Sequence, residues 1–597
     1  MGVLQFPNPP PENTVSRGGS TVNVAEQLVD TLARQGVRRI YGLVGDSLNP
    51  VVDAVRVHPD MEWVHVHHES SAAFAAGAES LLTGELAVCA GSCGPGNLHL
   101  LQGVYDAHRN GAKLLVIASH IPSGEIGSTF FQETHPQQLF AECSGYCEMV
   151  NSAAQGARVL HHAIQSTMAG EGASVLVLPG DIAEDKAVDA PDLASAIAPA
   201  RPAVIPDEAA VADLAAAIND ARTVTIFAGA GCADAHPELM ELAGKLQAPV
   251  GHSLGGKESV QYDNPYDVGM SGLLGYGGCQ QAMEEADLLL LIGTDFPYSS
   301  FLPTGNVAQI DARAAHLGRR TTVAHPVAGD AAETIRRLLP LVEPKDPAFL
   351  HKQLKHHARE LEKVIEAYTS GVEKHTPIHP EYVARILDEL ADRDAIFTVD
   401  TGMNNVWAAR YLTPNGRRRV LGSWRHGTMA NALPHAIGAA SATEGRQVIS
   451  MSGDGGLAML LGELLTVRRH DLDVKTIVFN NSSLGMVKLE MLVAGDPDWQ
   501  TDHAPVDYAA IAHGAGIPSV RITDPARVRE QLARALATPG PVLVDVVTDA
   551  NALSMPPEIT LDQVRGFAKA SARTVMAGGV GAMVDLAKAN LRNIPRP

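Results

Sequence analysis

The sequence predicts an α/β fold built from three doubly wound domains with parallel sheets, followed by a C-terminal tail. The chain has 597 residues, which at roughly 100–200 residues per domain allows three or four domains. Short apolar runs recur along it, and most are followed by glycine and then by a helix-like segment. Continuous apolar strands alternating with helices are typical of parallel sheets covered on both faces.

The apolar runs fall into three groups separated by proline-rich or polar segments near 190–207 and 348–378. The first group comprises 38–47, 85–97 and 113–120, the second 223–231, 286–295 and 306–312, and the third 395–402, 446–456, 475–483 and 541–549. We therefore expect a mobile N-terminal arm 1–20, a first domain 21–198, a second domain 199–345, a helical linker 346–378, a third domain 379–550 and a tail 551–597.

Composition excludes several classes of protein. A net charge of −21 argues against nucleic-acid binding, which needs a basic surface. We expect a cytoplasmic protein, because no apolar stretch approaches the roughly 18 residues of a membrane span and the N-terminus lacks a secretory signal. The C-x3-C pairs Cys89/Cys93 and Cys143/Cys147 could suggest zinc, but no histidine follows at zinc spacing, which favours reduced structural thiols.

The tail is basic although the whole chain is acidic. From Arg565 onward a single acid, Asp585, is opposed by six basic residues: Arg565, Lys569, Arg573, Lys588, Arg592 and Arg596. The tail could dock on the protein's own acidic surface. Alternatively it could contact anionic lipid, where each basic residue contributes about 1 kcal/mol. Val584, Ala587 and Leu591 would share one face of an amphipathic helix.

The stretch "MSGDGGLAML" (451–460) places Asp454 among glycines after an apolar run. A simple turn is one interpretation, because glycine and aspartate favour turns. A calcium loop is excluded, because Gly456 and Ala458 would occupy ligand positions. Asn481 ends the next apolar strand, beyond a predicted helix at 457–470. This βαβ unit would bring the Asp454 carboxylate and the Asn481 amide to one sheet edge, as oxygen ligands suited to Mg²⁺. The glycines would admit a diphosphate to the helix start.

This pattern is the fingerprint of thiamine diphosphate (ThDP) enzymes. From about residue 22 to the C-terminus the chain resembles the quinone-dependent pyruvate dehydrogenases of the pyruvate oxidase group. The resemblance is carried by "YGLVGDSLN", "AAFAAGAES", "GELAVCAGSCGPGNLHL", "FQETHPQ", "YDNPYDVGM", "HGTMANALPHAIGA" and "FNNSSLG". It implies that the three domains bind the pyrimidine of ThDP, FAD and the diphosphate, in chain order.

The resemblance also implies site residues. Mg²⁺ would be held by Asp454, Asn481 and the backbone oxygen of Ser483. Met429 would be the apolar wedge that bends the cofactor, and Glu69 would hydrogen-bond the pyrimidine N1′ from the neighbouring subunit as a catalytic acid. On local sequence alone, Glu69 resembles an ordinary residue at a helix start. The other expected ThDP contacts are Gly427, Thr428, Gly455, Gly456, Ser482, Leu484, Gly485, Met486 and Val487.

The expected FAD contacts lie in the second domain: Ser271, Gly272, Leu273, Leu274, Thr294, Asp295, Phe296, Pro297, Tyr298 and Asp311. Asp311 ends a strand, where a ribose-binding acid is expected. Phe131 and Gln132 would meet the pyruvate-derived group, and Glu490 would lie near the thiazolium. Met486 departs from relatives that carry phenylalanine there, so an aromatic relay for electrons is not expected.

The activity implied is oxidative decarboxylation of pyruvate to acetate and CO₂. Electrons would pass through FAD to a membrane quinone, ubiquinone or menaquinone. The enzyme would be a homotetramer, peripheral on the inner face of the cell membrane, with the tail on anionic lipid. The alternatives are a carboligase similar to acetolactate synthase and a phosphate-dependent pyruvate oxidase.

Overall fold

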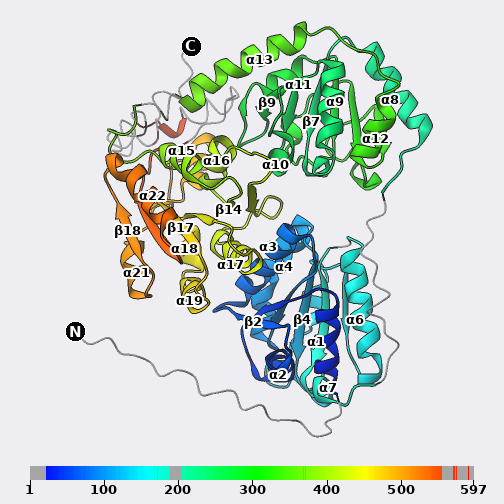
Figure 1. The fold of residues 1–597 in the computed structure, drawn as a ribbon, viewed down its shortest axis with the longest axis vertical. Helices are drawn as coiled ribbons and strands as arrows, with labels where there is room; N and C mark the ends of the chain where they lie inside the picture. The colour runs from blue at the N-terminus through cyan, green and yellow to red at the C-terminus, as the bar shows by residue number, and fades with distance from the viewer. Residues whose placement is uncertain are drawn as a thin grey trace.

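The computed structural model describes residues 22–170, 172–188, 203–366, 369, 371–553, 569–571, 573, 586 and 589. The predicted fold class is confirmed: three α/β units, each built on its own sheet, follow one another along the chain (Figure 1). The expected N-terminal arm, the boundary at 198/199 and the amphipathic face of Val584, Ala587 and Leu591 lie outside the described residues.

The first unit contains a six-stranded parallel sheet in the order β2-β1-β3-β4-β6-β5. Its strands are β1 (Arg39–Gly42), β2 (Glu62–His65), β3 (Ala87–Gly91), β4 (Leu114–His120), β5 (Tyr146–Met149) and β6 (Ser174–Pro179). Its helices are α1 (Val24–Arg34), α2 (Asn49–Val57), α3 (Glu69–Thr83), α4 (Pro95–Asn110), α5 (Pro136–Leu139), α6 (Ala153–Met168) and α7 (Gly180–Glu184). The central strands β3 and β4 are buried throughout, which explains their continuous apolar sequence.

The second unit contains a seven-stranded sheet in the order β10-β9-β8-β7-β11-β12-β13. Its strands are β7 (Val224–Ala228), β8 (Val250–His252), β9 (Asp267–Met270), β10 (Tyr276–Gly277), β11 (Leu288–Ile292), β12 (Val307–Asp311) and β13 (His325–Ala328). Its helices are α8 (Glu208–Asp220), α9 (His236–Leu246), α10 (Lys257–Val260), α11 (Cys279–Glu285) and α12 (Ala331–Leu338). Helix α13 (Ala348–Leu361) follows in the linker and packs on β9 and β10.

The second sheet departs from the expected all-parallel arrangement at one edge, where β10 runs antiparallel to β9. The chain returns on itself through a glycine-rich turn. Gly269 and Gly272 adopt positive φ angles of 88° and 102°, which favour glycine. The turn forms part of the wall of the cavity described below.

The third unit contains a six-stranded parallel sheet in the order β15-β14-β16-β17-β19-β18. Its strands are β14 (Ile396–Val399), β15 (Arg419–Gly422), β16 (Val448–Gly453), β17 (Val474–Asn480), β18 (Ser519–Ile522) and β19 (Val542–Val547). Its helices are α15 (Pro380–Leu390), α16 (Met403–Tyr411), α17 (Ala432–Ala442), α18 (Asp454–Met459), α19 (Glu463–Arg469), α20 (Gly485–Ala494), α21 (Tyr508–Gly514) and α22 (Val528–Ala537).

The helix expected at 457–470 is divided into α18 and α19 by a turn at 460–462. The turn lets Glu463 point inward, where its buried carboxylate accepts a hydrogen bond from the backbone N–H of His67 at 3.2 Å. A tertiary contact with the first unit therefore accompanies the break in the helix.

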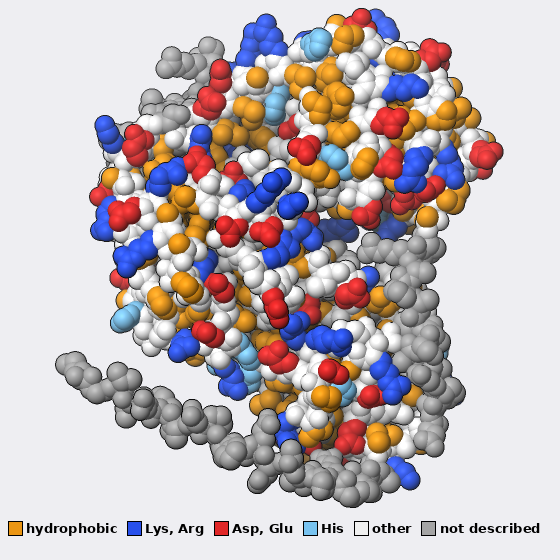
Figure 2. Space-filling model, viewed as in Figure 1, with side chains coloured by type: hydrophobic (Ala, Val, Ile, Leu, Met, Phe, Trp, Pro, Cys, Tyr) orange, Lys and Arg blue, Asp and Glu red, His pale blue; other side chains and the backbone are white. Residues whose placement is uncertain are grey.

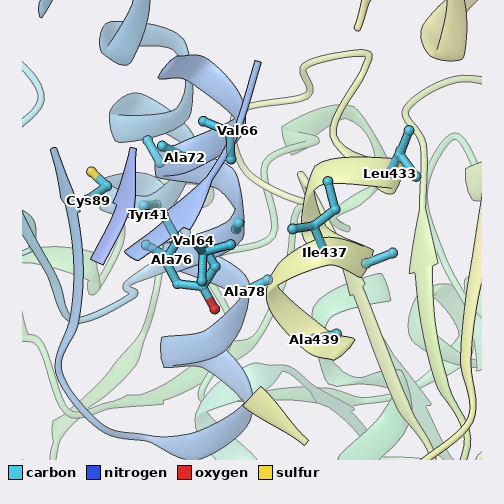
Figure 3. Packing of buried hydrophobic residues seen from close by; sticks show 14 of the residues in the cluster. Tyr41, Val64, Val66, Ala72, Ala76, Ala78, Cys89, Leu433, Ile437 and Ala439 are labelled. Carbon is cyan, nitrogen blue, oxygen red and sulfur yellow. The ribbon is translucent and has the colours of Figure 1, made fainter. Parts of the chain in front are cut away.

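Helices α3 and α17 join the first and third units (Figures 1 and 3). Alanines of α3, including Ala72 and Ala76, lie on one side, and Leu433 and Ile437 of α17 on the other. The helices approach so closely that a Cβ atom on Gly438 would lie 2.0 Å from the backbone oxygen of Ala75. Side chains of small volume make this contact possible.

Acidic and basic side chains are interspersed over the face shown in Figure 2. Within the described residues, none of the helices has the length and apolar character needed to cross a bilayer.

Candidate active site

Asp454 begins α18 at the carboxyl end of β16, next to the end of β17. Its side chain is nearly buried, and Oδ2 accepts a hydrogen bond from the backbone N–H of Ser482 at 2.6 Å. The ring Nε2 of His503 lies 3.2 Å from the same oxygen. Burial raises the pKa of Asp454, whereas His503 and the backbone N–H groups act in the opposite direction. The βαβ unit thus joins Asp454 to the segment that carries Asn481.

The segment 481–483 is shaped for presenting oxygen atoms. Asn481 Oδ1 accepts a hydrogen bond from the backbone N–H of Ser483 at 3.0 Å, and Ser482 has a φ of 54°. The hydroxyl of Ser483 is buried and has no hydrogen-bond partner among the described residues. A buried hydroxyl without a partner fits a site completed by a ligand. The donor set of carboxylate, amide and backbone oxygens fits Mg²⁺.

The glycines after Asp454 leave bare backbone at the start of α18. A Cβ atom on Gly455 would lie 2.7 Å from Leu484 and 3.5 Å from the end of Met429. A Cβ atom on Gly485 would lie 3.4 Å from the Asn481 amide nitrogen. The structure therefore brings most of the expected ThDP residues of the third unit together, and the bare backbone fits a diphosphate.

A cavity of about 420 Å³ lies where the second and third units meet, and Leu81 and Asn110 of the first unit also line it. Its size is typical of ligand pockets, which span roughly 300–1,000 Å³. Expected flavin contacts line it, namely Ser271, Leu273, Leu274, Thr294, Asp295, Phe296, Pro297 and Tyr298. Three expected residues of the ThDP site line the same cavity: Gly427, Met486 and Glu490. The two sets, far apart in sequence, thus share one space.

Two buried polar atoms in the cavity wall, Thr401 Oγ1 and Asn405 Oδ1, have no hydrogen-bond partner among the described residues. They suit a polar ligand, while Leu273, Leu274 and Phe296 offer apolar surface for a flat ring. Burial raises the pKa of Tyr298, and the nearby Glu490 carboxylate adds to this effect. These features fit a flavin beside the ThDP site.

Two of the expected flavin contacts, Gly272 and Asp311, do not line the cavity, and neither does Val487 of α20. Gly272 lies behind the wall, where a Cβ atom would meet Phe296 at 3.0 Å. Asp311 ends β12 and lies 3.4 Å from His316. Val487 is exposed on α20.

Glu69 is the first residue of α3 and is only 5% exposed. Its Oε2 lies 2.8 Å from His99 Nδ1, and a Cβ atom on Gly96 would lie 3.1 Å from Oε1. The ligand atoms of His68, Glu69 and His99 lie within 4.8 Å of one another, a geometry that could hold a metal ion.

Gln132 and Glu69 approach the same segment: a Cβ atom on Gly94 would lie 2.8 Å from Gln132, and one on Gly96 would lie against Glu69. Gln132 Oε1 is 3.3 Å from Cys93 Sγ, and the neighbouring Phe131 is 78% exposed. In the part of the chain that the structure describes, no hydrogen bond or ion pair joins Glu69, Phe131 or Gln132 to the cavity. The expected site residues therefore form two groups: one in the first unit, and one that the second and third units share.

Sequence reasoning missed several residues of the site. Asp400 and His503 are distant in sequence from Gly456 and Asp454, which they contact, and Arg425 lines the cavity directly before the motif that begins at His426. Lys257 lines the cavity, where burial lowers its pKa to about 8 and Nζ lies 3.2 Å from the Tyr276 hydroxyl. Its position in "LGGKES", after a strand and two glycines, was a usable signal.

The arrangement defines the chemistry that the chain itself can perform. Asp454 and Asn481 would hold the cation and, through it, a diphosphate. ThDP, when bound, supplies a carbon nucleophile and an electron sink for 2-oxo acids. Glu69 would hold a proton at the pyrimidine, and Met429 would fix the orientation of the two rings. These individual roles remain predictions.

Comparison with known proteins agrees with this geometry. Three family models match: the N-terminal TPP binding domain over residues 22–140, the central domain over 211–338 and the C-terminal TPP binding domain over 400–546 of thiamine pyrophosphate enzymes. The three models match one after another along the chain, in agreement with the three α/β domains that the sequence predicts.

Several curated proteins are similar over nearly their whole length. The putative thiamine pyrophosphate-containing protein YdaP of Bacillus subtilis (strain 168) is 34% identical, covering 91% of this chain and 94% of the relative. The acetolactate synthase isozyme 1 large subunit of Escherichia coli (strain K12) is 29% identical, covering 88% and 94%. A pyruvate oxidase of Lactiplantibacillus plantarum is 28% identical, covering 87% of each chain. With all three domain models matched in order, the chain belongs to the thiamine pyrophosphate enzyme family.

Proposed function

We propose that this enzyme oxidatively decarboxylates pyruvate to acetate and CO₂, with ThDP, Mg²⁺ and FAD as cofactors and a membrane quinone, ubiquinone or menaquinone, as electron acceptor. Water supplies the additional oxygen atom of acetate, and two electrons and two protons convert the quinone to the quinol. The observation that carries the proposal is the shared cavity, whose wall includes both Met486 and Glu490 of α20 and the flavin-type residues of the second unit.

A shared cavity suits electron transfer between two cofactors. Met486 is flexible and polarisable, and it can pack against a ring without closing the space. The apolar wall formed by Leu273 and Leu274 would exclude water from a reduced flavin. The relative named pyruvate oxidase supports pyruvate as the substrate, and the relative named acetolactate synthase supports the carboligase as the alternative.

We further place Glu69 in a site completed by a second copy of the chain, in a homotetramer. Glu69 and Gln132 have no described contact with the cavity of their own chain. Phe131 and Leu98, exposed on the same domain, offer apolar surface for such a contact.

The proposal includes a peripheral position on the inner face of the cell membrane. Ala570 and Leu586 of the tail pack against Leu489 and Leu492 of α20, the helix that carries Met486 and Glu490. Arg573 pairs with Asp496 at 2.9 Å. A tail that rests on α20 could respond to the state of the site, and its basic residues suit an anionic lipid surface.

The test is anaerobic addition of pyruvate to purified protein loaded with ThDP, Mg²⁺ and FAD, while the absorbance of oxidised flavin near ~450 nm is followed. Bleaching that is reversed by added quinone, with acetate formed, is the expected result. Flavin that stays oxidised while acetolactate accumulates would contradict the proposal and indicate a carboligase. Turnover that requires phosphate and yields acetyl phosphate would indicate the phosphate-dependent oxidase.

A further inference from the structure

The loop 427–431, between β15 and α17, has an unusual backbone. Gly427 and Ala430 have φ angles of 74° and 68°, in the left-handed region that a residue with a side chain rarely adopts. Such a conformation persists only where the surroundings determine it. Two buried carboxylates, one from each of two domains, provide those surroundings.

The first carboxylate is Asp400, at the end of β14. It accepts a hydrogen bond from the backbone N–H of Thr401 at 3.2 Å, and the backbone N–H groups of Ala430, Asn431 and Gly453 lie near enough to lower its pKa. Its side chain also lies directly against Gly456 of the diphosphate segment. Asp400 therefore joins the end of the loop to the start of α18.

The second carboxylate is Asp106, which reaches the loop from α4 of the first unit. It is 1% exposed, and Oδ1 accepts a hydrogen bond from the Ser423 hydroxyl at 2.5 Å. Ser423 Oγ in turn accepts a hydrogen bond from the backbone N–H of Thr428 at 3.0 Å. The other oxygen, Oδ2, lies 3.2 Å from His435 Nε2 of α17, which is also buried.

A further contact from α4 reaches the same loop. Gln102 Nε2 donates to Thr428 Oγ1 at 2.5 Å, and that hydroxyl donates to the backbone oxygen of Met429 at 2.8 Å. Thr428 is thus held at its backbone by Ser423 and at its side chain by Gln102. Asp106, Ser423, Thr428 and His435 are buried, whereas Gln102 is exposed and adds its contact from the rim. A buried polar network of this kind selects one arrangement of the groups that it joins.

We infer that Asp106 and Ser423 are positioning residues for the cofactor-binding loop. Through the N–H of Thr428 they fix the backbone that carries Met429, and thereby the direction of its side chain beside Gly455. This inference rests on the proposed role of Gly427, Thr428 and Met429 in holding ThDP. It adds that residues of the first domain of the same chain determine the orientation of the cofactor bound by the third.

The test compares Ser423→Ala, Ser423→Thr and a control, Thr466→Val. Thr466 is fully buried, and its hydroxyl contacts His67 Nδ1 at 2.8 Å across the same domain boundary, outside the loop. Two quantities are measured: the dissociation constant of ThDP with Mg²⁺ by calorimetry, and the exchange of its C2 proton with D₂O at saturating cofactor. Both are independent of pyruvate and of flavin.

For Ser423→Ala we expect ThDP to bind about tenfold more weakly, as is typical for loss of one buried hydrogen bond. Exchange at saturation should slow by about tenfold or more, because misorientation of reacting groups reduces rates steeply. Ser423→Thr, which restores the hydroxyl, should recover both quantities to within about threefold, and Thr466→Val should change neither.

Unchanged exchange in Ser423→Ala would overturn the inference, even if binding weakens, because a purely structural contact affects affinity alone. If that variant does not fold, Asp106→Asn serves instead. It keeps an oxygen for Ser423 but removes the charge, and we expect a smaller effect in the same direction. Failure of the unmodified protein to bind ThDP would refute the proposed function itself. That outcome differs from a failure of this inference, in which the unmodified protein binds ThDP and the variant exchanges the C2 proton at the same rate.

Discussion

The carboxylate of Asp400 lies against Gly456 so closely that a Cβ atom on the glycine would come within 1.8 Å of Asp400 Oδ2. Glycine at 456 is therefore required by the protein's own packing as well as by any ligand above it. The contact joins the end of β14 to the first turn of α18, two segments at the carboxyl edge of the third sheet, where the candidate diphosphate site lies.

Gly456→Ala should destabilise the fold. The Cβ atom would meet the Asp400 carboxylate, which is buried and accepts a hydrogen bond from the backbone N–H of Thr401. Overpacking of a core typically costs about 1–3 kcal/mol and occasionally more. Urea denaturation of the apoprotein measures the effect. Gly514→Ala, at a helix position where a Cβ atom meets nothing within 4 Å, is the matched control and should be neutral or slightly stabilising. Equal stability of the two variants would contradict the packing argument.

Asp400 should also make stability depend on pH. Burial raises the pKa of Asp400 to about 7, so the folded protein retains a proton that the unfolded chain releases near pH 4. Protonated Asp400 contributes its full stabilisation of the fold below about pH 4. Between about pH 4 and 7 this contribution decreases by up to roughly 1.4 kcal/mol per pH unit, and above about pH 7 it is lost.

Asp400→Asn removes this titration. The difference in unfolding free energy between the unmodified protein and the variant should therefore fall between pH 5 and 7 and remain constant from 7 to 8. Denaturant titrations at fixed protein concentration test this. A difference that rises with pH would show that Asp400 is charged in the folded state.

Asp454→Asn should weaken Mg²⁺-dependent binding of ThDP by at least roughly 100-fold, because a charged hard ligand is replaced by a neutral one. The amide oxygen can still accept the N–H of Ser482, so we expect the fold to be retained. Calorimetric titration of ThDP at several Mg²⁺ concentrations measures the loss. Asp60→Asn, at an exposed position in the first unit, controls for the change in net charge.

Glu69→Gln should separate catalysis from binding. Loss of a general acid reduces turnover by roughly 10²–10⁴, whereas the affinity for ThDP should change only a few-fold, since Asp454 and Asn481 are intact. Steady-state rates with pyruvate and calorimetric affinities are compared with Glu85→Gln, an exposed position two residues beyond the end of the same helix. A parallel loss of affinity and rate would assign Glu69 to binding rather than to acid catalysis.

Much of the fold follows from local sequence. Runs such as "LLLLIG" become central strands because both faces of a parallel strand are buried, so one continuous pattern marks them. Edge strands carry no such pattern. β2 contains Glu62 and His65 and is half exposed, and β10 has only two residues, so their pairing depends on the sheet that they join.

The contacts of the candidate site also include some that local sequence predicts and some that it does not. Asp454 and Asn481 could be paired from sequence, because one βαβ unit carries both. The contact between Asp106 and Ser423 spans 317 residues, and that between His503 and Asp454 spans 49, with His503 in a loop that no strand or helix pattern marks. The first contact depends on the packing of α3 and α17, which brings two domains together, and the second on how a loop folds back within the third unit. Neither can be inferred from spacing along the chain.

The last prediction concerns the flavin side of the cavity. Leu273 is 41% exposed and lines it, so an acidic substitution should be tolerated by the fold while opposing a ligand that is apolar at its ring and anionic at its phosphates. Losing burial of a leucine side chain costs about 1.5–3 kcal/mol. Leu273→Asp should therefore reduce FAD affinity by at least about tenfold, measured by equilibrium dialysis of the apoprotein.

Leu341→Asp is the matched control for this change, because Leu341 is 46% exposed in the second unit and does not line the cavity. It should bind FAD as the unmodified protein does. ThDP affinity should be equal in both variants, since the Asp454 segment is untouched. If Leu273→Asp retained full FAD affinity, the flavin would have to lie elsewhere, and the shared cavity would no longer support electron transfer between the two cofactors.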